Sequence, residues 1–236
     1  PSALAMVTTE PTGGAVWHAN RGAITMRVNV RGKSAHVGQA YLGVNAFEQM
    51  LGIARPLVEL GNEMLEQRTS FALEEDDARG SMLVVGGAAG SGANFNVVPD
   101  AAWFSVDCRF NPEETLEGVL AQINETITEA AREIGADVWI EVLQRQPSAS
   151  TDVSHPAAEI LARCVSDVEG DPPRFQLCPG VLETRWYAQL GVPAFAYGGG
   201  RLDVSHGPHE YIDEAAMRRC AAVYALYASE MLKSDK

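Results

Sequence analysis

The chain has 236 residues, of which 46% are hydrophobic and 21% are charged. This composition is typical of one large or two small globular domains. The formal net charge of −13 argues against nucleic-acid binding, because an acidic surface repels phosphate backbones. The sequence contains no run of eighteen apolar residues, so we expect no membrane span, and residues 1–10 lack the segments of a signal peptide.

The four cysteines lie far apart in the sequence and form no CxxC pair. Their spacing fits neither a zinc ribbon nor a disulfide framework. We therefore expect buried, reduced thiols in a cytoplasmic protein.

The first part of the chain alternates between strand and helix patterns. Residues 23–31 have apolar side chains at every second position, which predicts a half-buried strand. From Gly43 to Leu60 the apolar residues recur at helical spacing, and Gly61 with Asn62 is expected to end that helix. Residues 81–87 predict a short strand, and the glycine-rich residues 86–92 predict a loop.

The next elements complete a recognisable order. Residues 101–110 predict a long strand, and a helix is expected from Pro112 to about Gly135, followed by a strand over residues 138–143. Strand, helix, strand, strand, helix, strand is the split βαβ order of a ferredoxin-like fold. Such a fold packs two helices on one face of an antiparallel sheet.

After a polar linker over residues 144–152, the pattern becomes that of an open α/β layer. The expected elements are helices over residues 155–168, 183–190 and 213–232 and strands over residues 175–178 and 192–197. In the final helix we expect Ala216, Cys220, Val223, Leu226, Tyr227 and Met231 to face inward. A sheet made only from these segments and residues 1–20 would be small and would have exposed edges.

Two histidines occupy positions where chemistry is conceivable. His36 follows the first strand, and His206 follows a glycine-rich turn. A single loop histidine is more often a solvated or structural residue than a catalytic one, and imidazole chemistry is only a reason to look. His206 and His209 are three residues apart in a proline-containing loop, so they do not form the helical HExxH arrangement of zincins.

Three further polar residues lie at strand ends. Asn96 and Arg109 flank one strand, and an arginine fork can bind a carboxylate through two hydrogen bonds. The structural alternative for Arg109 is an ion pair with a nearby acid such as Asp107 or Glu113. Glu10 follows the first apolar segment, and it is either a ligand-facing carboxylate or an exposed turn acid.

Read together, the motifs resemble one family. They are residues 9–13 (TEPTG), 21–22 (RG), 32–36 (GKSAH), 43–46 (GVNA), 96–100 (NVVPD), 106–109 (VDCR), 191–194 (GVPA), 197–200 (YGGG) and 205–211 (SHGPHEY). In order and approximate spacing they resemble the zinc exopeptidase and deacylase family that includes acetylornithine deacetylase, succinyl-diaminopimelate desuccinylase, aminoacylase and bacterial glutamate carboxypeptidase. The similarity runs through nearly the whole chain.

The resemblance implies an α/β fold and a role for each candidate. It implies a partial zinc-exopeptidase catalytic domain over residues 1–21 and 144–236, with an inserted ferredoxin-like lid and dimerisation domain over residues 22–143. Glu10 and His206 match metal ligands of the family, and His36 matches the lid histidine that stabilises an oxyanion in the partner subunit. Asn96, Arg109 and Gly199 match substrate-binding positions.

The resemblance also implies that part of the site is missing. A complete family site holds two zinc ions, and its N-terminal part supplies a His-x-Asp motif, a bridging Asp and a Glu pair, none of which precedes Glu10. Residues 179–183 (PGVLE) also stand where the family has a Gly-Gly-Thr-Asp-like turn. We therefore expect an N-terminally truncated member that binds zinc weakly or not at all and is inactive alone.

These observations lead to two hypotheses about function. The first is a zinc-dependent hydrolase that cleaves an amide bond of an N-acyl amino acid or small peptide and forms a homodimer through its lid domain. The second is a non-catalytic dimerisation or binding module derived from that family. A generic α+β protein is a third alternative that the ordered motifs disfavour, and neither a nucleic-acid nor a membrane partner is expected.

Overall fold

The chain folds into two compact units. The structure, a computed structural model, describes residues 3–234, without the side chains of Asp76 and Ser234. Unit 1 comprises Pro1–Arg21, Ser70–Asp76 and Ala149–Lys236, and unit 2 comprises Gly22–Thr69 and Asp77–Ser148. The expected division differs from these units at residues 70–76 and 144–148, and its outermost residues, 1–2 and 235–236, lie outside the described part. Among the described residues, no helix is long and apolar enough to cross a membrane.

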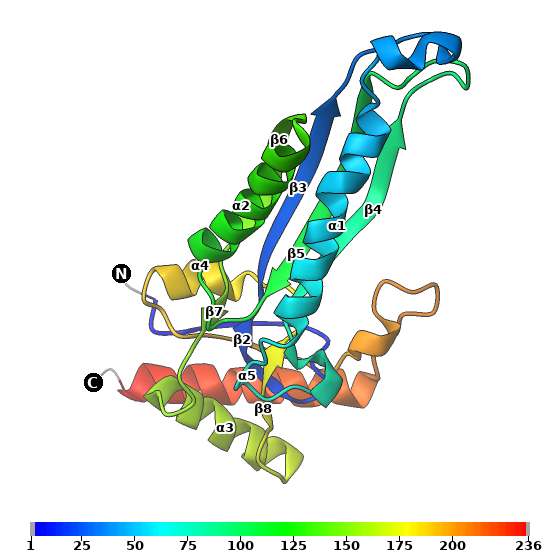
Figure 1. Ribbon diagram of the computed structural model, residues 1–236. Helices are drawn as coiled ribbons and strands as arrows, with labels where there is room; N and C mark the ends of the chain where they lie inside the picture. Colours follow the sequence, from blue (N-terminus) through cyan, green and yellow to red (C-terminus); the bar gives the residue numbers. More distant parts are fainter. Residues whose placement is uncertain (1–2, 235–236) are drawn as a thin grey trace. The chain divides into compact units, whose positions relative to one another are not determined.

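Unit 2 has the expected βαββαβ order (Figure 1). Its elements are β3 (Gly22–Arg31), α1 (Ala46–Leu65), β4 (Met82–Ser91), β5 (Ala101–Phe110), α2 (Leu116–Ile134) and β6 (Asp137–Gln146), with short 3-10 helices η1 (Val37–Leu42) and η2 (Asp76–Arg79). All pairings in its sheet are antiparallel, in the order β4-β5-β3-β6. The predicted ferredoxin-like arrangement is therefore confirmed.

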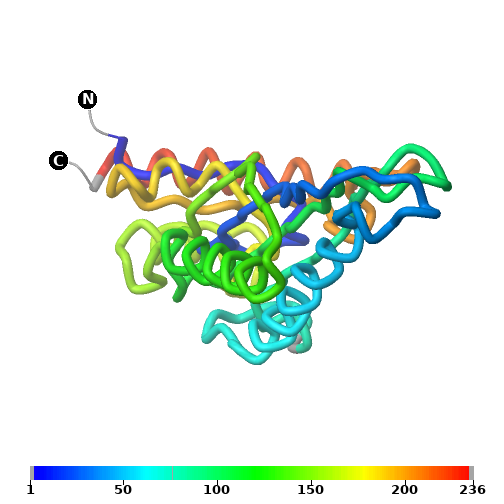
Figure 2. Tube along the Cα trace, turned by 45° about the horizontal axis from the view of Figure 1, so that its top comes forward, coloured from blue at the N-terminus to red at the C-terminus, as the bar shows by residue number. Residues whose placement is uncertain are grey.

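Alternation along β3 builds the core of unit 2. Ile24, Met26, Val28 and Val30 are fully buried and pack against the inward face of α1, which includes Ile53. The two helices lie side by side on this one face of the sheet, and Figure 2 shows the same pairing from a second direction. Burial of such side chains contributes about 1.5–3 kcal/mol each, so this face holds the unit together.

Three local predictions in unit 2 were wrong. Helix α1 continues through Gly61 to Leu65, because this glycine lies against β4, where a Cβ atom would come within 3.1 Å of the Leu83 carbonyl oxygen. The glycine-rich residues 86–91 belong to β4, which accommodates them through a bulge between Val85 and Ala89. Helix α2 begins after Thr115, whose hydroxyl accepts a hydrogen bond from Gly118 N–H, and not at Pro112.

Unit 1 is built on a mixed sheet. Its strands are β1 (Met6–Thr8), β2 (Val16–Asn20), β7 (Ala149–Ser150), β8 (Phe175–Cys178) and β9 (Ala194–Tyr197), in the order β1-β9-β2-β7 with β8 also paired to β2. β1 runs parallel to β9, whereas β2 runs antiparallel to β9. Sequence analysis missed β2, since all five of its residues are buried and no alternation marks them.

The helices of unit 1 cover both faces of this sheet. They are α3 (Pro156–Glu169), α4 (Thr184–Gln189) and α5 (Glu214–Ser234), with a short 3-10 helix η3 (Leu202–Val204). α3 and α5 share one apolar core with Val16 and Phe195. Cys220, Val223 and Tyr227 of α5 face inward as expected, but Leu226 is exposed, so that part of the prediction was wrong. All four cysteines are free and buried, as expected.

Candidate functional site

Glu10 lies in a loop that follows β1 and is held against the end of β9. The Thr12 hydroxyl donates to the Gly198 carbonyl oxygen at 2.9 Å and accepts from Gly198 N–H at 3.0 Å. A Cβ atom on Gly198 would come within 2.2 Å of the Glu10 carbonyl oxygen, so only glycine permits this approach. The loop thus presents Glu10 beside the carboxyl ends of two parallel strands, where α/β sheets bind ligands.

A cavity of about 560 Å³ opens beside this loop. Its lining comprises residues 9–11, 198–201, Ser205, residues 210–212, Met217, Cys220, Ala221 and Tyr224. Burial first, and the nearby Glu183 carboxylate second, raise the pKa of Glu10 above its ordinary value. A carboxylate in such surroundings favours protonation or a cation, and perturbed groups of this kind gather at functional sites.

His206 occupies an unusual backbone conformation. Its φ is +61°, the only positive value for a non-glycine residue in the described part of the chain. Its N–H donates to a Glu210 carboxylate oxygen at 3.0 Å. A left-handed non-glycine residue costs about 1–3 kcal/mol, and such residues cluster at functional sites. Ser205 and Glu210, on either side of the His206 turn, line the cavity with Glu10, whereas the imidazole itself is exposed.

Gly199 has a structural reason to be glycine beyond its predicted role. A Cβ atom at this position would come within 2.7 Å of the Ala216 Cβ at the start of α5. Gly199 also lines the cavity. Its backbone is therefore available to a ligand, while the helix behind it leaves no room for a side chain.

The segment that departs from the family pattern leads into α4. Pro179 and Gly180 follow β8, and Glu183 precedes the first helical residue. The buried Arg185 donates to the Leu182 carbonyl oxygen and lies 3.8 Å from the Glu183 carboxylate. This segment places a second carboxylate near Glu10, which explains part of the rise in the pKa of Glu10.

The residues present do not fit a zinc site by themselves. Within residues 3–234, no group of three or more His, Cys, Asp or Glu side chains could hold a metal ion. Catalytic zinc needs three protein ligands, and a dinuclear site needs more. Glu10 and His206 can therefore supply at most part of such a site.

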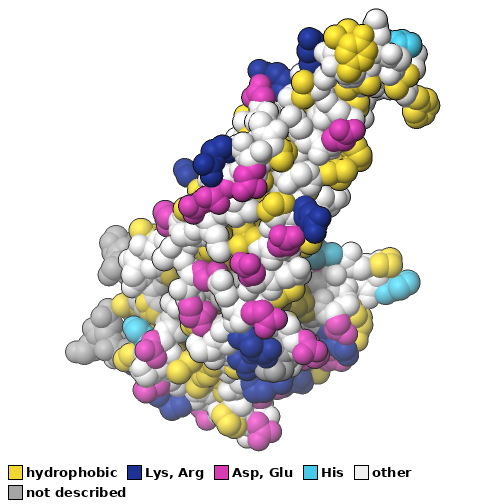
Figure 3. Space-filling model, viewed as in Figure 1, with side chains coloured by type: hydrophobic (Ala, Val, Ile, Leu, Met, Phe, Trp, Pro, Cys, Tyr) yellow, Lys and Arg dark blue, Asp and Glu magenta, His cyan; other side chains and the backbone are white. Residues whose placement is uncertain are grey.

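His36 and Asn96 meet at one end of unit 2. His36 forms an isolated β-bridge with Val97, and Val37 N–H donates to the Asn96 carbonyl oxygen at 3.0 Å. Nδ1 of His36 accepts from Gly38 N–H at 3.1 Å, so a neutral imidazole carries its proton on Nε2. This end of unit 2 also exposes apolar side chains, and Figure 3 shows them gathered beside a histidine. The imidazole can donate a hydrogen bond outward from the exposed tip.

Arg109 lies at the other end of β5 and already has a partner. It lies eight positions along the strand from Ala101 at the tip end, a span of roughly 27 Å. Its Nε lies 3.1 Å from Asp107, and this aspartate also accepts from the Thr25 hydroxyl at 2.7 Å. The structural alternative that the sequence left open is thus present. The structure brings His36 and Asn96 together but leaves Arg109 apart from them within unit 2.

Several cavity residues escaped the sequence analysis. Glu183 belongs to the segment that departs from the family pattern, and its proximity to Glu10 depends on the fold. Glu210 was visible in the motif after His206 but was not given a role. Met217 and Tyr224 lie seven residues apart on one side of α5, and this spacing was the available signal for them.

Comparison with known proteins agrees with the fold and the motifs. The sequence model of the peptidase dimerisation domain of M20 peptidases matches residues 18–135. A putative succinyl-diaminopimelate desuccinylase of Mycobacterium tuberculosis is 26% identical over 213 residues, covering 87% of this chain and 52% of the relative. A probable carboxypeptidase of Emericella nidulans is 27% identical over 223 residues, covering 91% and 48%.

Solved structures show the same fold. A tripeptidase from Staphylococcus aureus matches with a TM-score of 0.76 at 15% identity, covering 99% of this chain and 58% of that chain. An M20 family metallo-carboxypeptidase from Sulfolobus solfataricus matches with a TM-score of 0.69 at 15% identity, covering 94% and 61%. The chain spans about half the length of the curated relatives it matches. The zinc-exopeptidase resemblance is confirmed, and the chain belongs to the M20 peptidase family through its peptidase dimerisation domain.

Proposed function

We propose that this chain forms part of a hydrolase that cleaves an amide bond in an N-acyl amino acid or a small peptide. The observation that carries the proposal is the cavity beside Glu10, at the carboxyl ends of β1 and β9, in a chain of the M20 family. Two relatives named above are described as a putative succinyl-diaminopimelate desuccinylase and a probable carboxypeptidase, and those names support this substrate class. The four free thiols favour a cytoplasmic location.

Two zinc ions are the cofactor that we propose for a complete site, with Glu10 and His206 among their ligands. The described residues do not form that site, so further ligands must come from another polypeptide segment. The proposed roles therefore concern this chain's own side chains. The chain alone is expected to be inactive.

His36 is the proposed oxyanion donor. Its Nε2 is free to donate because Nδ1 already accepts from Gly38 N–H. A positioned donor acts on charge that develops during the reaction. Asn96, which lies beside His36, would hydrogen-bond the substrate through its amide.

Arg109 is the proposed carboxylate clamp. Its guanidinium binds Asp107, so a substrate carboxylate would compete with that aspartate for the fork. Gly199 would contribute backbone to the cavity wall. These contacts bind charge that the substrate already carries, and so they act on ground state and transition state alike.

The partner that we propose for unit 2 is a second copy of the chain. β3 is an interior strand that pairs with β5 and β6, so it cannot form a dimer edge. The available edges are β4 and β6. Strand β4 contains no charged residue, whereas natural sheets usually protect an exposed edge with charge or proline.

Helix α1 adds an apolar stripe beside β4. Phe47, Leu51, Val58 and Leu65 are 42% to 52% exposed and fall on one side of the helix. Gly61 of α1 lies against Leu83, whereas Gly52 faces Ile134 of α2, so the stripe is on the β4 side. We call β4 and this stripe the uncharged flank. A two-fold axis could pair the flank with itself and cover both apolar surfaces.

One observation favours the alternative of a non-catalytic dimerisation module. Within the described residues the uncharged flank is complete, whereas no three-ligand metal cluster exists. Such a module would dimerise and would have no hydrolytic activity in any assembly. The two functions therefore differ in a directly measurable way.

The test uses a fusion protein, in which the part of the M. tuberculosis relative that lies outside the match is joined to the N-terminus of this chain. With zinc present, release of amine is measured from a panel of N-acyl amino acids and dipeptides. We expect hydrolysis of at least one substrate. His36→Ala should lower kcat by about 10²–10³ with little change in KM, and Arg109→Ala should mainly raise KM. A zinc-loaded, folded fusion that hydrolyses nothing would favour the non-catalytic module.

Mixing variants tests whether His36 acts across the dimer. In the fusion protein, a His36→Ala subunit combined with a His206→Ala subunit should recover a fraction of the activity. One of the two sites in the mixed dimer then keeps both histidines. Subunit exchange is verified by mass spectrometry. No recovery despite exchange would leave His36 as a structural tip residue.

A further inference from the structure

The outer face of the unit 2 sheet, opposite α1 and α2, carries polar and aromatic side chains. Both helices pack on the other face, so no helix in the described part of unit 2 covers this one. In the central strand β3, Arg27 points to the outer face, because its neighbours Met26 and Val28 are buried in the core. The side chain of Arg27 is half-buried. A cation thus stands at the centre of a sheet face that a small anion can approach.

Arg27 is held in place by Trp103 of β5. Its guanidinium carbon lies 4.1 Å from the centre of the Trp103 ring, which is the geometry of a cation–π contact. The indole in turn lies against Gly90 of β4, where a Cβ atom would come within 2.7 Å of the indole nitrogen. Glycine therefore leaves the indole the room that it needs beside the backbone. The stack of Gly90, Trp103 and Arg27 fixes the direction of the arginine fork.

Arg27 has no acidic partner, although an acid lies directly opposite it. Within residues 3–234 its side chain forms no hydrogen bond and no ion pair, and its Nε is buried without an acceptor. Glu141, its neighbour on β6, accepts instead from the Asn29 amide at 3.1 Å and from the Trp139 indole at 3.3 Å. The nearest acid is therefore already engaged, and the fork of Arg27 is left without a carboxylate.

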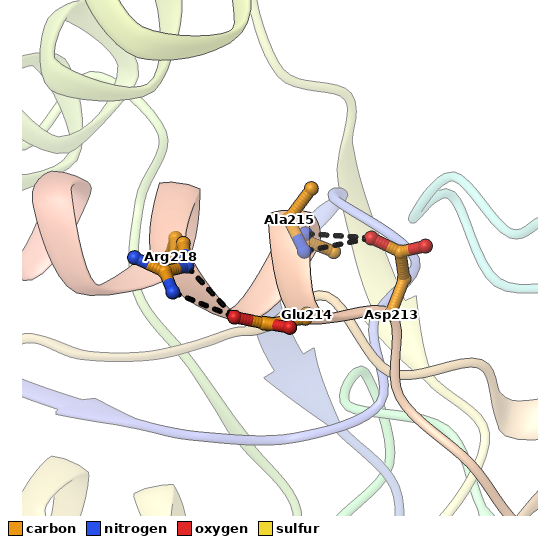
Figure 4. A network of polar contacts seen from close by, with 5 residues as sticks. Asp213, Glu214, Ala215 and Arg218 are labelled. Carbon is orange, nitrogen blue, oxygen red and sulfur yellow. Dashed lines mark hydrogen bonds and ion pairs between the residues drawn. The ribbon is translucent and has the colours of Figure 1, made fainter.

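Other arginines of the chain show the ordinary arrangement. Arg31, on the same sheet face, lies 5.3 Å from the centre of the Trp139 ring and also pairs with Asp137 at 3.3 Å. On the surface of α5, Arg218 pairs with Glu214 at 2.6 Å (Figure 4). A shielded donor without an acceptor lowers stability, so an arginine that is stacked but unpaired calls for a ligand as its explanation.

A second donor lies opposite Arg27 on β5. Ser105 is its partner across the two strands, and the Ser105 hydroxyl accepts from Ala88 N–H at 2.9 Å. No acceptor for the hydroxyl proton is present among the described residues. Toward β4, Gly86 and Gly87 bring no side chain over this position, and even a Cβ atom on Gly87 would stay 3.6 Å from the Ser105 oxygen. An arginine fork and a hydroxyl donor beside open space suit a carboxylate, which only accepts hydrogen bonds.

Arg109 lies on the same face but too far away to share one carboxylate with Arg27. Ser105 is four positions from Arg109 along β5, a span of roughly 14 Å. Arg109 also pairs with Asp107 at 3.1 Å, so a ligand must compete with that aspartate, whereas Arg27 gives up no internal partner. The outer face therefore holds two separate positions for carboxylates.

We propose that Arg27, Ser105 and Trp103 form a second carboxylate-binding subsite, which selects short peptides that carry a carboxylate at each end. The assignment to a substrate rests on the proposed function, in which Arg109 holds the first carboxylate. An extended peptide covers about 3.5 Å per residue, and a glutamate side chain adds to its reach. A three-residue peptide that begins with glutamate therefore spans the two positions, and Arg27 determines the preference for it.

The test compares N-acetyl-Glu-Gly-Gly with N-acetyl-Gln-Gly-Gly, which differ only in the side-chain carboxylate. Binding to the intact 236-residue chain is measured by a nuclear magnetic resonance titration, with the indole N–H signal of Trp103 as the reporter. We expect the glutamate peptide to bind about 10-fold more tightly, because a charge-assisted pair is stronger than a neutral one. Equal affinity of the two peptides would overturn the proposal.

Matched substitutions locate the preference at the subsite. Arg27→Gln should abolish the preference for the glutamate peptide, and Gly90→Ala should reduce it, since the added Cβ atom would displace the indole of Trp103. Arg31→Gln removes an arginine that already has a partner, so it should leave the preference unchanged. Amide spectra verify that each variant keeps its folded sheet. A preference that survives Arg27→Gln, or that Arg31→Gln removes equally well, would overturn the proposal.

The fusion protein separates this subsite from the proposed function. In the fusion, Arg27→Gln should raise KM for the glutamate peptide by about 10-fold, with little change in kcat or in KM for the glutamine peptide. A binding preference without any hydrolysis would reject the proposed function alone. Hydrolysis of both peptides with equal KM would reject the subsite alone.

Discussion

The two units differ in where they leave apolar surface exposed. In unit 2, both helices pack on one face of the sheet and enclose a continuous core. In unit 1, α5 leaves one apolar side open beside β1, whose outer edge pairs with no strand among residues 3–234, and this open side ends at Glu10. The difference teaches that the apolar surface of unit 2 suits the proposed second copy of the chain, whereas the open apolar side in unit 1 lies at the candidate site.

A second contrast lies within unit 2, between its two sheet edges. β4 has no charged residue, whereas β6 carries Asp137, Glu141 and Arg145. Two of these have partners on β3, since Arg31 lies 3.3 Å from Asp137 and the Asn29 amide donates to Glu141 at 3.1 Å. Charges of this kind discourage pairing with another strand, so the β4 edge is the one suited to a second copy.

The largest expected effect comes from placing charge on the uncharged flank. Leu51→Glu combined with Val58→Glu should weaken dimerisation by roughly 10³-fold, because two carboxylates would be buried in an apolar interface. Light scattering over a concentration series would measure the change. Leu143→Glu on β6, which is 63% exposed, should leave the dimer intact and serves as the control.

Two results would break this contrast. A native chain that is monomeric at tens of micromolar would remove the role of the flank. A dimer that dissociates with Leu143→Glu but not with the flank variant would move the interface to β6.

A smaller effect is expected from the polar core of unit 2. The Asn111 amide donates to the carbonyl oxygens of Gln67 and Arg79, both at 2.9 Å, and its side chain is buried. Asn111→Ala removes these donors and should destabilise unit 2 by about 2–3 kcal/mol. Hydrogen exchange of β5 amides would report the loss.

A substitution in unit 1 provides the matched comparison. The Thr151 hydroxyl donates to the Ala194 carbonyl oxygen at 3.1 Å and accepts from Ala194 N–H at 3.0 Å. Thr151→Val should accelerate exchange in β9 and leave β5 unchanged. If each substitution accelerated exchange in both units equally, the two would unfold as one, and the comparison between them would lose its meaning.

The smallest expected effect concerns Glu10 and pH. Burial, with a smaller contribution from Glu183, raises the pKa of Glu10 in the folded protein. Folding therefore favours the protonated acid. The resulting contribution to the free energy of unfolding is present below pH about 4 and is lost as the pH rises through the folded pKa. Near pH 7, Glu10→Gln should raise the free energy of unfolding by less than about 1 kcal/mol, which a slightly higher melting temperature would report. Near pH 4 it should leave the melting temperature unchanged. Equal shifts at both pH values would contradict this.

Sequence patterns predicted the unit 2 fold well because each element carries its own period. β3 and β5 alternate, and the buried residues of α1 recur at helical spacing. The errors have tertiary causes. Gly61 lies inside a helix because it packs against β4, and the glycines of β4 lie inside a strand because β4 pairs with β5. Neither neighbour is visible from the local sequence.

The candidate site was less predictable. Motif order pointed to Glu10, His36 and His206, but the proximity of Glu183 to Glu10 and the cavity between the Glu10 loop and α5 depend on segments far apart in sequence. For Arg109, the sequence left open both carboxylate binding and an ion pair with a nearby acid. The ion pair with Asp107 became evident only from the strand geometry.

Zinc content tests the central claim most directly, since the claim is that this chain holds only part of a hydrolase site. Elemental analysis after dialysis against zinc-free buffer would compare the chain alone with the fusion that supplies the uncovered half of a relative. We predict little zinc in the chain alone, because Glu10 and His206 fall short of the three protein ligands that catalytic zinc needs, and about two ions per chain in the fusion. Two tightly held zinc ions in the chain alone would contradict the account.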